Sequence, residues 1–146
     1  WYLCDIEYDG VTYNCAGQMM MAQKAALFGV TTTERRIKAI RDLADQKALG
    51  RTVSDFDDLV WERHRYNIVL KINFSKFRQY PKLRRQLAAT GAKHITEASP
   101  YDLIWGIDFK ADHPDACEPT RWCDRNQLGR ILMDVRESLG ANRSAQ

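Results

Sequence analysis

Two carboxylates that could carry out acid–base chemistry, Glu97 and Asp102, lie on either side of Pro100. Residues 93–98 alternate in the manner of a β-strand, so Glu97 shares a face with Ile95. A carboxylate on a buried face must be hydrogen-bonded or have a raised pKa, and a raised pKa is what a general acid needs. Glu97 is therefore either a general acid or a structural residue that caps a turn. Asp102 is either a second reacting carboxylate or the cap of the turn after Pro100.

Lys24 and the arginines near Asn126 are candidates for binding an anion. Lys24 has apolar neighbours on both sides, so its amine either reaches solvent or pairs with a phosphate or a carboxylate. Asn126 is expected to begin a helix, and the free backbone N–H groups of a helix N-terminus bind phosphate. A charged surface is the alternative interpretation of the three arginines around this N-terminus, which are Arg121, Arg125 and Arg130.

Two tryptophans, Trp105 and Trp122, are expected in loops or at strand ends, where an indole either stacks on a nucleobase or lines the core. Both interpretations stay open. The motifs of several other chemistries are absent, because the chain has no GxGxxG, GxxxxGKS/T, GxSxG or HExxH sequence. The absence of these motifs therefore argues against common nucleotide-binding folds and serine hydrolases.

The composition is that of a globular protein, with 146 residues, 45% hydrophobic and 28% charged, and a net charge of +3. A chain of this length can fold without disulfides or a structural metal.

The four cysteines form no CxxC pair, so we expect reduced thiols and an intracellular, cytoplasmic protein. His113, Cys117 and Cys123 match no standard metal-ligand spacing, and we expect neither a metal nor another cofactor. No apolar stretch approaches the roughly 20 residues that cross a bilayer. The chain begins at Trp1 without a signal-peptide pattern, and we expect preceding residues to be missing.

The N-terminal half is predicted to contain a hairpin followed by helices. Asp9 and Gly10 are the turn pair of a two-residue β-hairpin. A helix is predicted over residues 18–28, and the spacing of Thr31 and Glu34 is that of a capping box that starts a second helix. After a short helical stretch that ends at Gly50, the longest helix is predicted to begin at Ser54 and to bury one face, which carries Phe56, Val60, Trp61, Ile68 and Ile72.

The C-terminal half is predicted to mix helices and strands. A helix begins at Pro81, strands follow at residues 93–98 and 103–107, and a long loop covers residues 109–125. The last helix is capped by Asn126, ends at Gly140 and has an apolar stripe at Leu128, Leu132, Val135 and Leu139. The expected class is α+β: a compact, mainly helical single domain over residues 1–146, with a small sheet or hairpin.

Five sequence runs together resemble the NADAR family, also called YbiA-like, in order and spacing. They are QMMMAQKA at 18–25, KALGR at 47–51, NFSKF at 73–77, EASPYDLIWG at 97–106 and NQLGRILMDVR at 126–136. The resemblance implies a compact α+β domain that binds ADP-ribose or phosphoribosyl compounds and hydrolyses an N-glycosidic bond. It also implies two substrate classes, which are ADP-ribose attached to guanine in nucleic acid and the ribosylated pyrimidine intermediates of riboflavin biosynthesis.

The resemblance assigns roles to individual residues. Glu97 and Asp102 match the two acidic positions of the family's Glu-Ala-Ser-Pro-x-Asp block and are the expected catalytic residues. Hydrolysis of a ribose–base bond passes through an oxocarbenium-like state and needs an acid, a carboxylate near the sugar and a positioned water. The family positions expected to line the ligand or to hold its phosphates fall on Lys24, Arg51, Trp61, Lys76, Trp105, Gly106 and Asn126.

Three positions depart from the family pattern. Gly17 stands where the family usually has a catalytic-site Glu, Val30 where Asp is common, and Asp124 where Gly is common. The missing carboxylate at Gly17 removes a candidate general base or ribose partner. Three functions therefore stay open: release of ADP-ribose from guanine in nucleic acid, hydrolysis of a riboflavin precursor, and binding of ADP-ribose by a catalytically weakened module. The expected partners are these nucleotides or nucleic acids, with no membrane.

Overall fold

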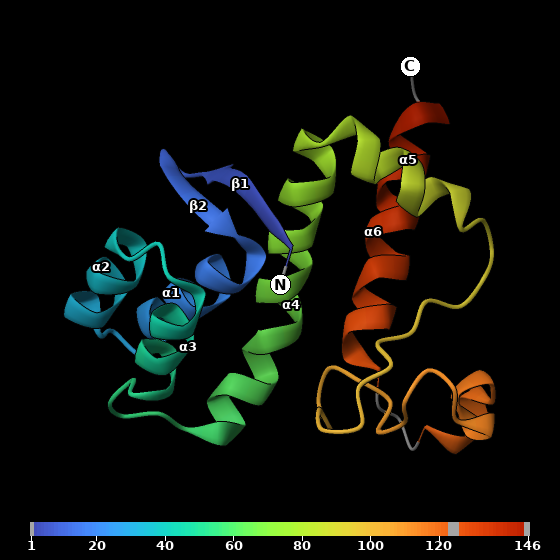
Figure 1. Ribbon diagram of the computed structural model, residues 1–146. Coiled ribbons are helices and arrows are strands. Elements are labelled where there is room, and N and C mark those ends of the chain that lie inside the picture. Colours follow the sequence, from blue (N-terminus) through green and yellow to red (C-terminus); the bar gives the residue numbers. More distant parts are fainter. Residues whose placement is uncertain (1, 123–125, 145–146) are drawn as a thin grey trace. The chain divides into compact units, whose positions relative to one another are not determined.

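The computed structural model of the chain describes residues 2–122 and 126–144, the last four of them as helix backbone, and the chain divides into two compact units (Figure 1). The N-terminal unit (Trp1–Gln79) contains β1 (Leu3–Tyr8), β2 (Val11–Cys15), α1 (Ala16–Leu27), α2 (Thr31–Ala39), α3 (Leu43–Arg51) and α4 (Asp58–Gln79). The C-terminal unit (Tyr80–Gln146) contains α5 (Pro81–Ala89), the short 3-10 helices η1 (Pro114–Cys117) and η2 (Pro119–Arg121), and α6 (Gln127–Ser144). The fold is mostly helical with a small antiparallel sheet, as predicted.

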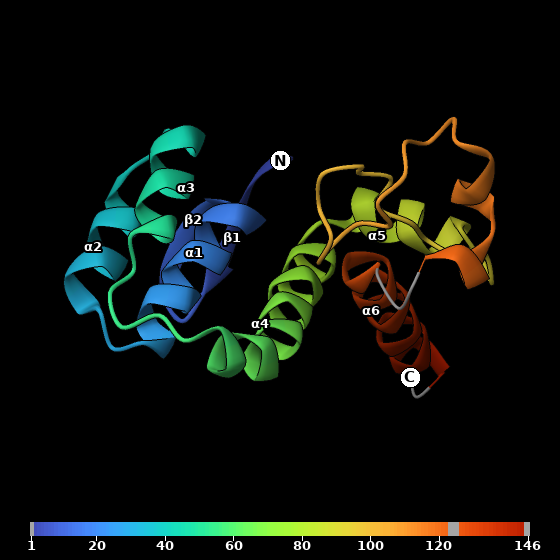
Figure 2. The same ribbon diagram turned by 90° about the horizontal axis from the view of Figure 1, so that it is seen from below.

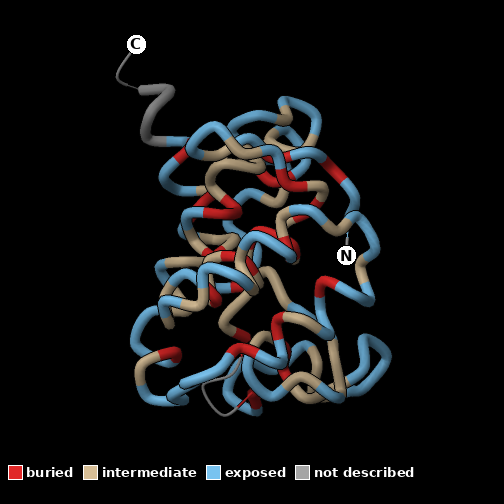
Figure 3. Tube along the Cα trace, turned by 90° about the vertical axis from the view of Figure 1, so that its left-hand side faces the viewer, coloured by how far each residue is buried: buried red, intermediate tan, exposed pale blue. Residues whose placement is uncertain are grey.

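The predicted hairpin is confirmed. β1 and β2 pair antiparallel, and the turn residues Asp9 and Gly10 have φ of 48° and 72°, the left-handed geometry that a two-residue hairpin requires. Ile6 and Tyr13 are paired across the hairpin and are both buried. The ribbon therefore contributes one apolar face to the core of the N-terminal unit (Figure 3).

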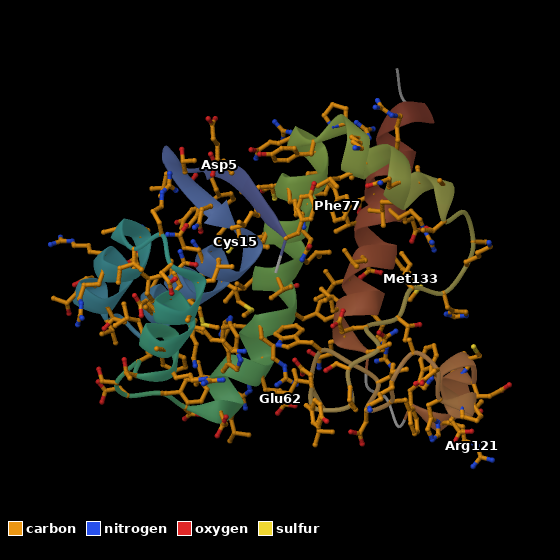
Figure 4. All side chains as sticks on the ribbon, viewed as in Figure 1. Asp5, Cys15, Glu62, Phe77, Arg121 and Met133 are labelled. Carbon is orange, nitrogen blue, oxygen red and sulfur yellow. The ribbon has the colours of Figure 1, made fainter. Side chains whose placement is uncertain are left out.

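α1 packs against α2, α3 and α4 and forms the centre of the N-terminal unit. Its N-terminus is capped by the sulfur of Cys15, which accepts from the Gln18 N–H (3.2 Å) and which Figure 4 labels at the end of β2. The Gln18 side chain is fully buried and donates to the carbonyl oxygens of Ile37 and Ile40, both at 2.9 Å. A polar side chain thus ties α1 to the end of α2 with its hydrogen-bonding groups satisfied.

α2 begins at Thr31 as predicted, but without the predicted capping box, whereas α4 begins later than predicted. Thr31 is the first residue of α2 and makes no side-chain cap, and Glu34 pairs with Lys38 one turn later, so the capping box is wrong. α4 starts after Asp57, whose Oδ1 accepts from the N–H groups of residues 59 and 60, and not after Ser54. Phe56 therefore precedes the helix.

α4 is the longest helix in the described part of the chain, as predicted. Its buried residues are Trp61, Val69, Ile72 and Asn73, so Val60 and Ile68 of the predicted stripe are only half-buried. Among residues 2–122 and 126–144, no helix combines the length and the apolar character needed to cross a membrane.

In the C-terminal unit, α5 packs against α6 (Figure 2). The buried stripe of α6 is Ile131, Val135 and Leu139, spaced by one turn, and it faces a core that includes Leu87. Leu128 and Leu132 of the predicted stripe are half-buried. α6 also continues past Gly140 to Ser144, so the predicted helix end is wrong.

The two predicted C-terminal strands do not form. Residues 93–98 have no regular secondary structure and pair with no strand in the described part of the chain, and residues 103–107 are mostly turns. Their backbone groups bond locally instead: the Ser99 and Ile107 N–H groups both donate to the Glu97 carbonyl oxygen (3.0 and 3.1 Å). The following loop contains η1 and η2, and residues 123–125, including Asp124 and Arg125, lie outside the described residues.

Candidate functional site

Asn126 fixes residues 97–106, the Glu97 loop, by bonding on both sides of its amide. Its Nδ2 donates to the Ile95 carbonyl oxygen (2.8 Å), and its Oδ1 accepts from the Glu97 N–H (3.0 Å). Its backbone N–H donates to the Gly106 carbonyl oxygen (2.8 Å). Asn126 is 2% exposed and has a φ of 74°, a left-handed conformation that Asn adopts more readily than most residues. Asn126 thus holds both ends of the loop instead of capping α6 with its side chain.

Asp102 adopts the turn-capping role. Its Oδ1 accepts from the N–H groups of Ile104 (3.1 Å) and Trp105 (2.8 Å), and its carbonyl oxygen accepts from the Gly106 N–H (3.1 Å). The side chain is half-buried, and both side-chain bonds use the same carboxylate oxygen. The other oxygen has no hydrogen-bond partner among the described residues, so turn capping leaves it available to a ligand.

The predicted burial of Glu97 is wrong. Without a strand at residues 93–98, the alternation that placed its side chain beside Ile95 does not operate, and Glu97 is exposed. Only its backbone is tied down, through its N–H and its carbonyl oxygen. The Glu97 carboxylate thus stands on a fixed backbone and faces solvent.

Two glycines, Gly106 in the Glu97 loop and Gly129 in α6, occupy positions where the neighbouring atoms leave no room for a side chain. A Cβ on Gly106 would lie 3.0 Å from the carbonyl oxygens of both Glu97 and Asp102. A Cβ on Gly129 would overlap the Ile95 carbonyl oxygen and the Asn126 amide. Gly129 was missed by sequence reasoning, although a glycine inside a helix is unfavourable by about 1 kcal/mol and therefore suggests a packing reason.

The two tryptophans near the Glu97 loop differ in their surroundings. Trp105 is half-buried in the loop, and its carbonyl oxygen accepts from the Leu128 N–H (3.2 Å). Trp122 is 7% exposed, its Nε1 donates to the Asp115 carbonyl oxygen (3.1 Å), and its ring meets His94 edge-on at 6.5 Å. Trp122 therefore lines the core, and Trp105 is the better candidate for contact with a ligand.

The arginines expected around the N-terminus of α6 do not gather into a described phosphate site. Arg121 is exposed on η2, where Figure 4 labels it, and Arg130 is exposed on α6. Both have interactions of their own within the structure. Arg125, the third member of the set, lies outside the described residues.

In the N-terminal unit, Lys24 lies among aromatic rings. Its Nζ is 4.0 Å from the centre of the Phe56 ring and 5.8 Å from that of Trp61, and it donates to the Gly50 carbonyl oxygen (3.1 Å). We call Lys24, Phe56, Trp61 and this carbonyl the Lys24 cluster. Burial lowers the pKa of Lys24 below its ordinary value, and the charge of Asp58 opposes this only in part. Such desolvation is what makes a lysine amine available as a nucleophile or base.

The remaining predicted site residues of this unit lie at different distances from the Lys24 cluster. Arg51 follows Gly50 directly and is exposed at the end of α3. Gly17 is half-buried in the first turn of α1, and a spacing of seven residues places it on the same face of the helix as Lys24. Lys76 is about four turns along α4 from Trp61.

Two further observations concern this unit. The Lys76 amine lies 5.0 Å from the Tyr2 ring and 5.7 Å from the Phe77 ring, so it is separate from the Lys24 cluster. Phe56, which sequence reasoning assigned to the buried face of α4, is instead 38% exposed and lies 5.2 Å from Phe28. An aromatic residue just before a helix N-cap gives no sequence signal for contact with a distant lysine.

No three His, Cys, Asp or Glu side chains gather as a metal site within residues 2–122 and 126–140. Cys123, one of the three residues considered for such a site, lies outside the described residues. The described candidates for chemistry are therefore carboxylates, an amine and aromatic rings.

Comparison with known proteins finds a family model, sequence relatives and a solved structure that are similar to this chain. The family model described as the NADAR domain matches residues 3–140. An N-glycosidase of Acanthamoeba polyphaga mimivirus is 41% identical over 125 residues, which is 86% of this chain and 74% of that protein. A riboflavin biosynthesis protein of Vibrio vulnificus is 31% identical over 139 residues, and this chain spans 34% of its length. The solved structure of the Escherichia coli protein YbiA has a TM-score of 0.75 at 24% identity, covering 99% of this chain and 77% of that one.

Proposed function

The chain belongs to the NADAR family, and from this premise we propose that it hydrolyses the N-glycosidic bond between ribose and a nucleobase. We propose that its substrate is ADP-ribose attached to guanine in nucleic acid. The observation that carries this proposal is the Glu97 loop, which presents two carboxylates and Trp105. Hydrogen bonds to Asn126 and Gly106 fix the backbone of this loop. A relative named an N-glycosidase matches most of this chain, which supports the same reaction class.

The chemistry of the proposal uses the different settings of the two carboxylates. Cleavage of a ribose–base bond develops positive charge on the sugar and negative charge on the departing base. Asp102 holds one oxygen in the turn and offers the other as a fixed negative charge beside the sugar. Glu97 is exposed and free to exchange protons, which suits an acid for the base or a base for the attacking water.

Lys24 lies in the N-terminal unit, and burial lowers the pKa of its amine below the ordinary value. A simple phosphate counter-ion would be better served by a fully charged, solvated lysine. We therefore propose that Lys24 acts in the N-terminal unit as a nucleophile or base, and not as a counter-ion of the pyrophosphate. Arg51, exposed beside Gly50, is the better candidate for a phosphate contact in this unit.

The test is release of free ADP-ribose from an oligonucleotide that carries ADP-ribosylated guanine. The wild-type chain is expected to release ADP-ribose, and Glu97→Gln is expected to lower the rate at least about 100-fold, the usual size of a lost acid–base contribution. Because Glu97 is exposed, the variant should keep the stability of the wild type. Failure of both the wild type and Gly17→Glu to release product would end the proposal.

The riboflavin pathway provides a second candidate, supported by the Vibrio vulnificus relative named for that pathway. In this case the same residues would cleave the ribosylated pyrimidine intermediate, a small-molecule phosphoribosyl compound. The two candidates are separated by supplying each substrate alone at equal concentration and comparing kcat/KM.

The third candidate is a binding module, and Gly17 is the observation that favours it. α1 has no acidic residue in its first turn, so the position of the family Glu carries no charge. If the chain is a binding module, calorimetry should show that it binds ADP-ribose. Neither the wild type nor the Gly17→Glu variant should then release product from any substrate.

We further propose that residues 1–146 act as one NADAR domain, since the family model includes residues of both units. We also propose an intracellular, cytoplasmic location. The described cysteines Cys4, Cys15 and Cys117 are free thiols, which is typical of a reducing compartment.

A further inference from the structure

A small pocket lies between α5 and α6, in the C-terminal unit. It has a volume of about 70 Å³ and is lined by Arg84, Arg85 and Arg136 around an apolar floor that includes Leu87 and Leu139. We infer that this arginine pocket binds the backbone phosphates of a polynucleotide, so that the protein acts on a polymer and not only on free nucleotides. This inference rests on the proposed function, in which the modified guanine is part of a nucleic acid, and it adds the surface that holds the phosphates of that strand.

Two of the arginines are held in place by neutral groups. Arg84 Nη2 donates to the Leu139 carbonyl oxygen (2.9 Å). Arg136 Nη1 donates to Thr90 Oγ1 (2.6 Å) and to the Lys93 carbonyl oxygen (2.9 Å). Carbonyl and hydroxyl oxygens orient a guanidinium without neutralising it. Both side chains are half-buried, so their orientation is fixed before any ligand arrives.

The positive charge of the pocket has no carboxylate partner among the described residues. Neither described salt bridge of the structure involves Arg84, Arg85 or Arg136. Residues 80–96 contain four basic residues and no Asp or Glu. On α6, Glu137 and Asp134 are turned from Arg136 by about 100° and 160° of helix rotation, and neither lines the pocket. The local field is therefore positive, although the whole chain carries only +3.

The chemistry of the lining favours phosphate over a nucleobase. A guanidinium presents a planar fork of donors that matches phosphate oxygens, and three of them around one pocket suit a chain of phosphates. Among the described residues, the lining has no aromatic ring on which a base would stack and no side-chain acceptor that would read a base edge. Binding should thus be independent of nucleotide sequence and sensitive to salt.

The experiment is fluorescence anisotropy with a short, unmodified single-stranded oligothymidylate, compared for Arg85→Glu and Arg35→Glu. Arg85 is exposed and makes no described hydrogen bond, so its replacement should leave the fold intact. Arg35 is equally exposed on α2 in the N-terminal unit and gives the same change in net charge. We expect Arg85→Glu to weaken binding about tenfold and to reduce the slope of log K against log salt by about 1, with little change in Arg35→Glu.

Equal effects of the two variants, or no effect of Arg85→Glu, would overturn the inference. So would Arg85-dependent binding of a polyglutamate peptide that matches or exceeds oligothymidylate binding. The probe carries no ADP-ribose, so the result does not depend on turnover. If the wild-type chain hydrolyses free ADP-ribosylated guanosine but does not bind oligothymidylate, only the arginine pocket is contradicted. If the wild-type chain binds oligothymidylate through Arg85 but releases no product, only the proposed function is contradicted.

Discussion

In the N-terminal unit the candidate site residues Lys24 and Trp61 and the Gly50 carbonyl come from three different helices, α1, α4 and α3. In the C-terminal unit, Glu97, Asp102 and Trp105 come from a loop without regular structure, which is fixed by Asn126. Packed helices position a side chain through many small contacts, whereas the loop depends on a few hydrogen bonds and on glycines that leave no free volume.

The electrostatic settings of the two regions also differ. Lys24 is half-buried, and its pKa is lowered because burial disfavours the charged amine. Glu97 is exposed, and Asp102 is half-buried with one oxygen bonded to two N–H groups. Helix packing has therefore lowered the pKa of an amine, while the loop presents two carboxylates on a fixed backbone. Substitutions that separate positioning from charge test this contrast.

The largest effect is expected from Gly129→Ala in α6. The added methyl group would overlap the Ile95 carbonyl oxygen and the Asn126 amide, which are parts of the clamp on the Glu97 loop. We expect a loss of about 3 kcal/mol in the free energy of unfolding, at the upper end for an overpacked site, with a parallel loss of activity. Urea denaturation measures the first and product release the second.

Two glycine controls sharpen this prediction. Gly140→Ala, in the same helix, meets nothing within 4 Å and should stabilise the protein by about 0.5–1 kcal/mol through helix propensity. Gly50→Ala in the N-terminal unit overlaps only the flexible side chain of Met21, so its cost should be smaller than that of Gly129→Ala. A Gly50→Ala variant less stable than Gly129→Ala would reverse the proposed contrast between the units.

Asp102→Ala is expected to cost about 1–2 kcal/mol, because the N–H groups of Ile104 and Trp105 lose their acceptor. Asp102→Asn keeps an oxygen acceptor for the turn and removes the charge. If the charge acts on the sugar, Asp102→Asn should have nearly wild-type stability and a strongly reduced kcat. Full activity in Asp102→Asn would reduce Asp102 to a positioning residue.

Gly17→Glu is expected to stabilise the protein by about 1 kcal/mol, since it replaces a helical glycine and adds an acidic residue to the first turn of α1. Gly17→Ala separates the two contributions, because it changes helix propensity without adding charge. The new carboxylate lies on the Lys24 face of α1, so Gly17→Glu and not Gly17→Ala should increase turnover. Equal turnover in both variants would show that the missing carboxylate does not limit the reaction.

Lys24→Met is expected to give the smallest change in stability, with a defined dependence on pH. A lowered lysine pKa means that the unfolded chain binds more protons between the folded-state pKa and the ordinary value of 10.5. The free energy of unfolding of the wild type should therefore rise relative to that of Lys24→Met as the pH rises through that window. At neutral pH the Lys24→Met variant should be the more stable protein.

The activity of Lys24 variants distinguishes an amine from a cation. Lys24→Arg keeps a positive charge that cannot be deprotonated. We expect Lys24→Arg to be as inactive as Lys24→Met if Lys24 acts as a nucleophile or base. Retained activity in Lys24→Arg would indicate a phosphate counter-ion and contradict the role proposed for this residue.

The sequence predicts the regular elements of this fold well, because their signals are local. The Asp9-Gly10 turn needs two positive φ values, and the helix formers of α1 end at Gly29. The start of α4 was missed because Ser54 and Asp57 are both good caps, and only the structure shows that Asp57 accepts the N–H groups.

The Glu97 loop could not be predicted in the same way. Its alternation resembles a strand, but its backbone groups bond to Asn126, about 30 residues away in sequence, and to each other. The burial of Glu97 was inferred from that strand and failed with it. The family motif names Asn126 and residues of this loop as one set, and Asn126 does bond to the loop, while the site roles of these residues stay predictions.

Release of ADP-ribose from guanine in an oligonucleotide tests the central claim most directly. The wild-type chain and Glu97→Gln are compared at equal concentration, with unfolding measured for both. The account predicts free ADP-ribose and an intact oligonucleotide from the wild type, and at least about 100-fold slower release from a Glu97→Gln variant of unchanged stability. Equal rates for the two proteins, or no release by the wild type and Gly17→Glu, would contradict it.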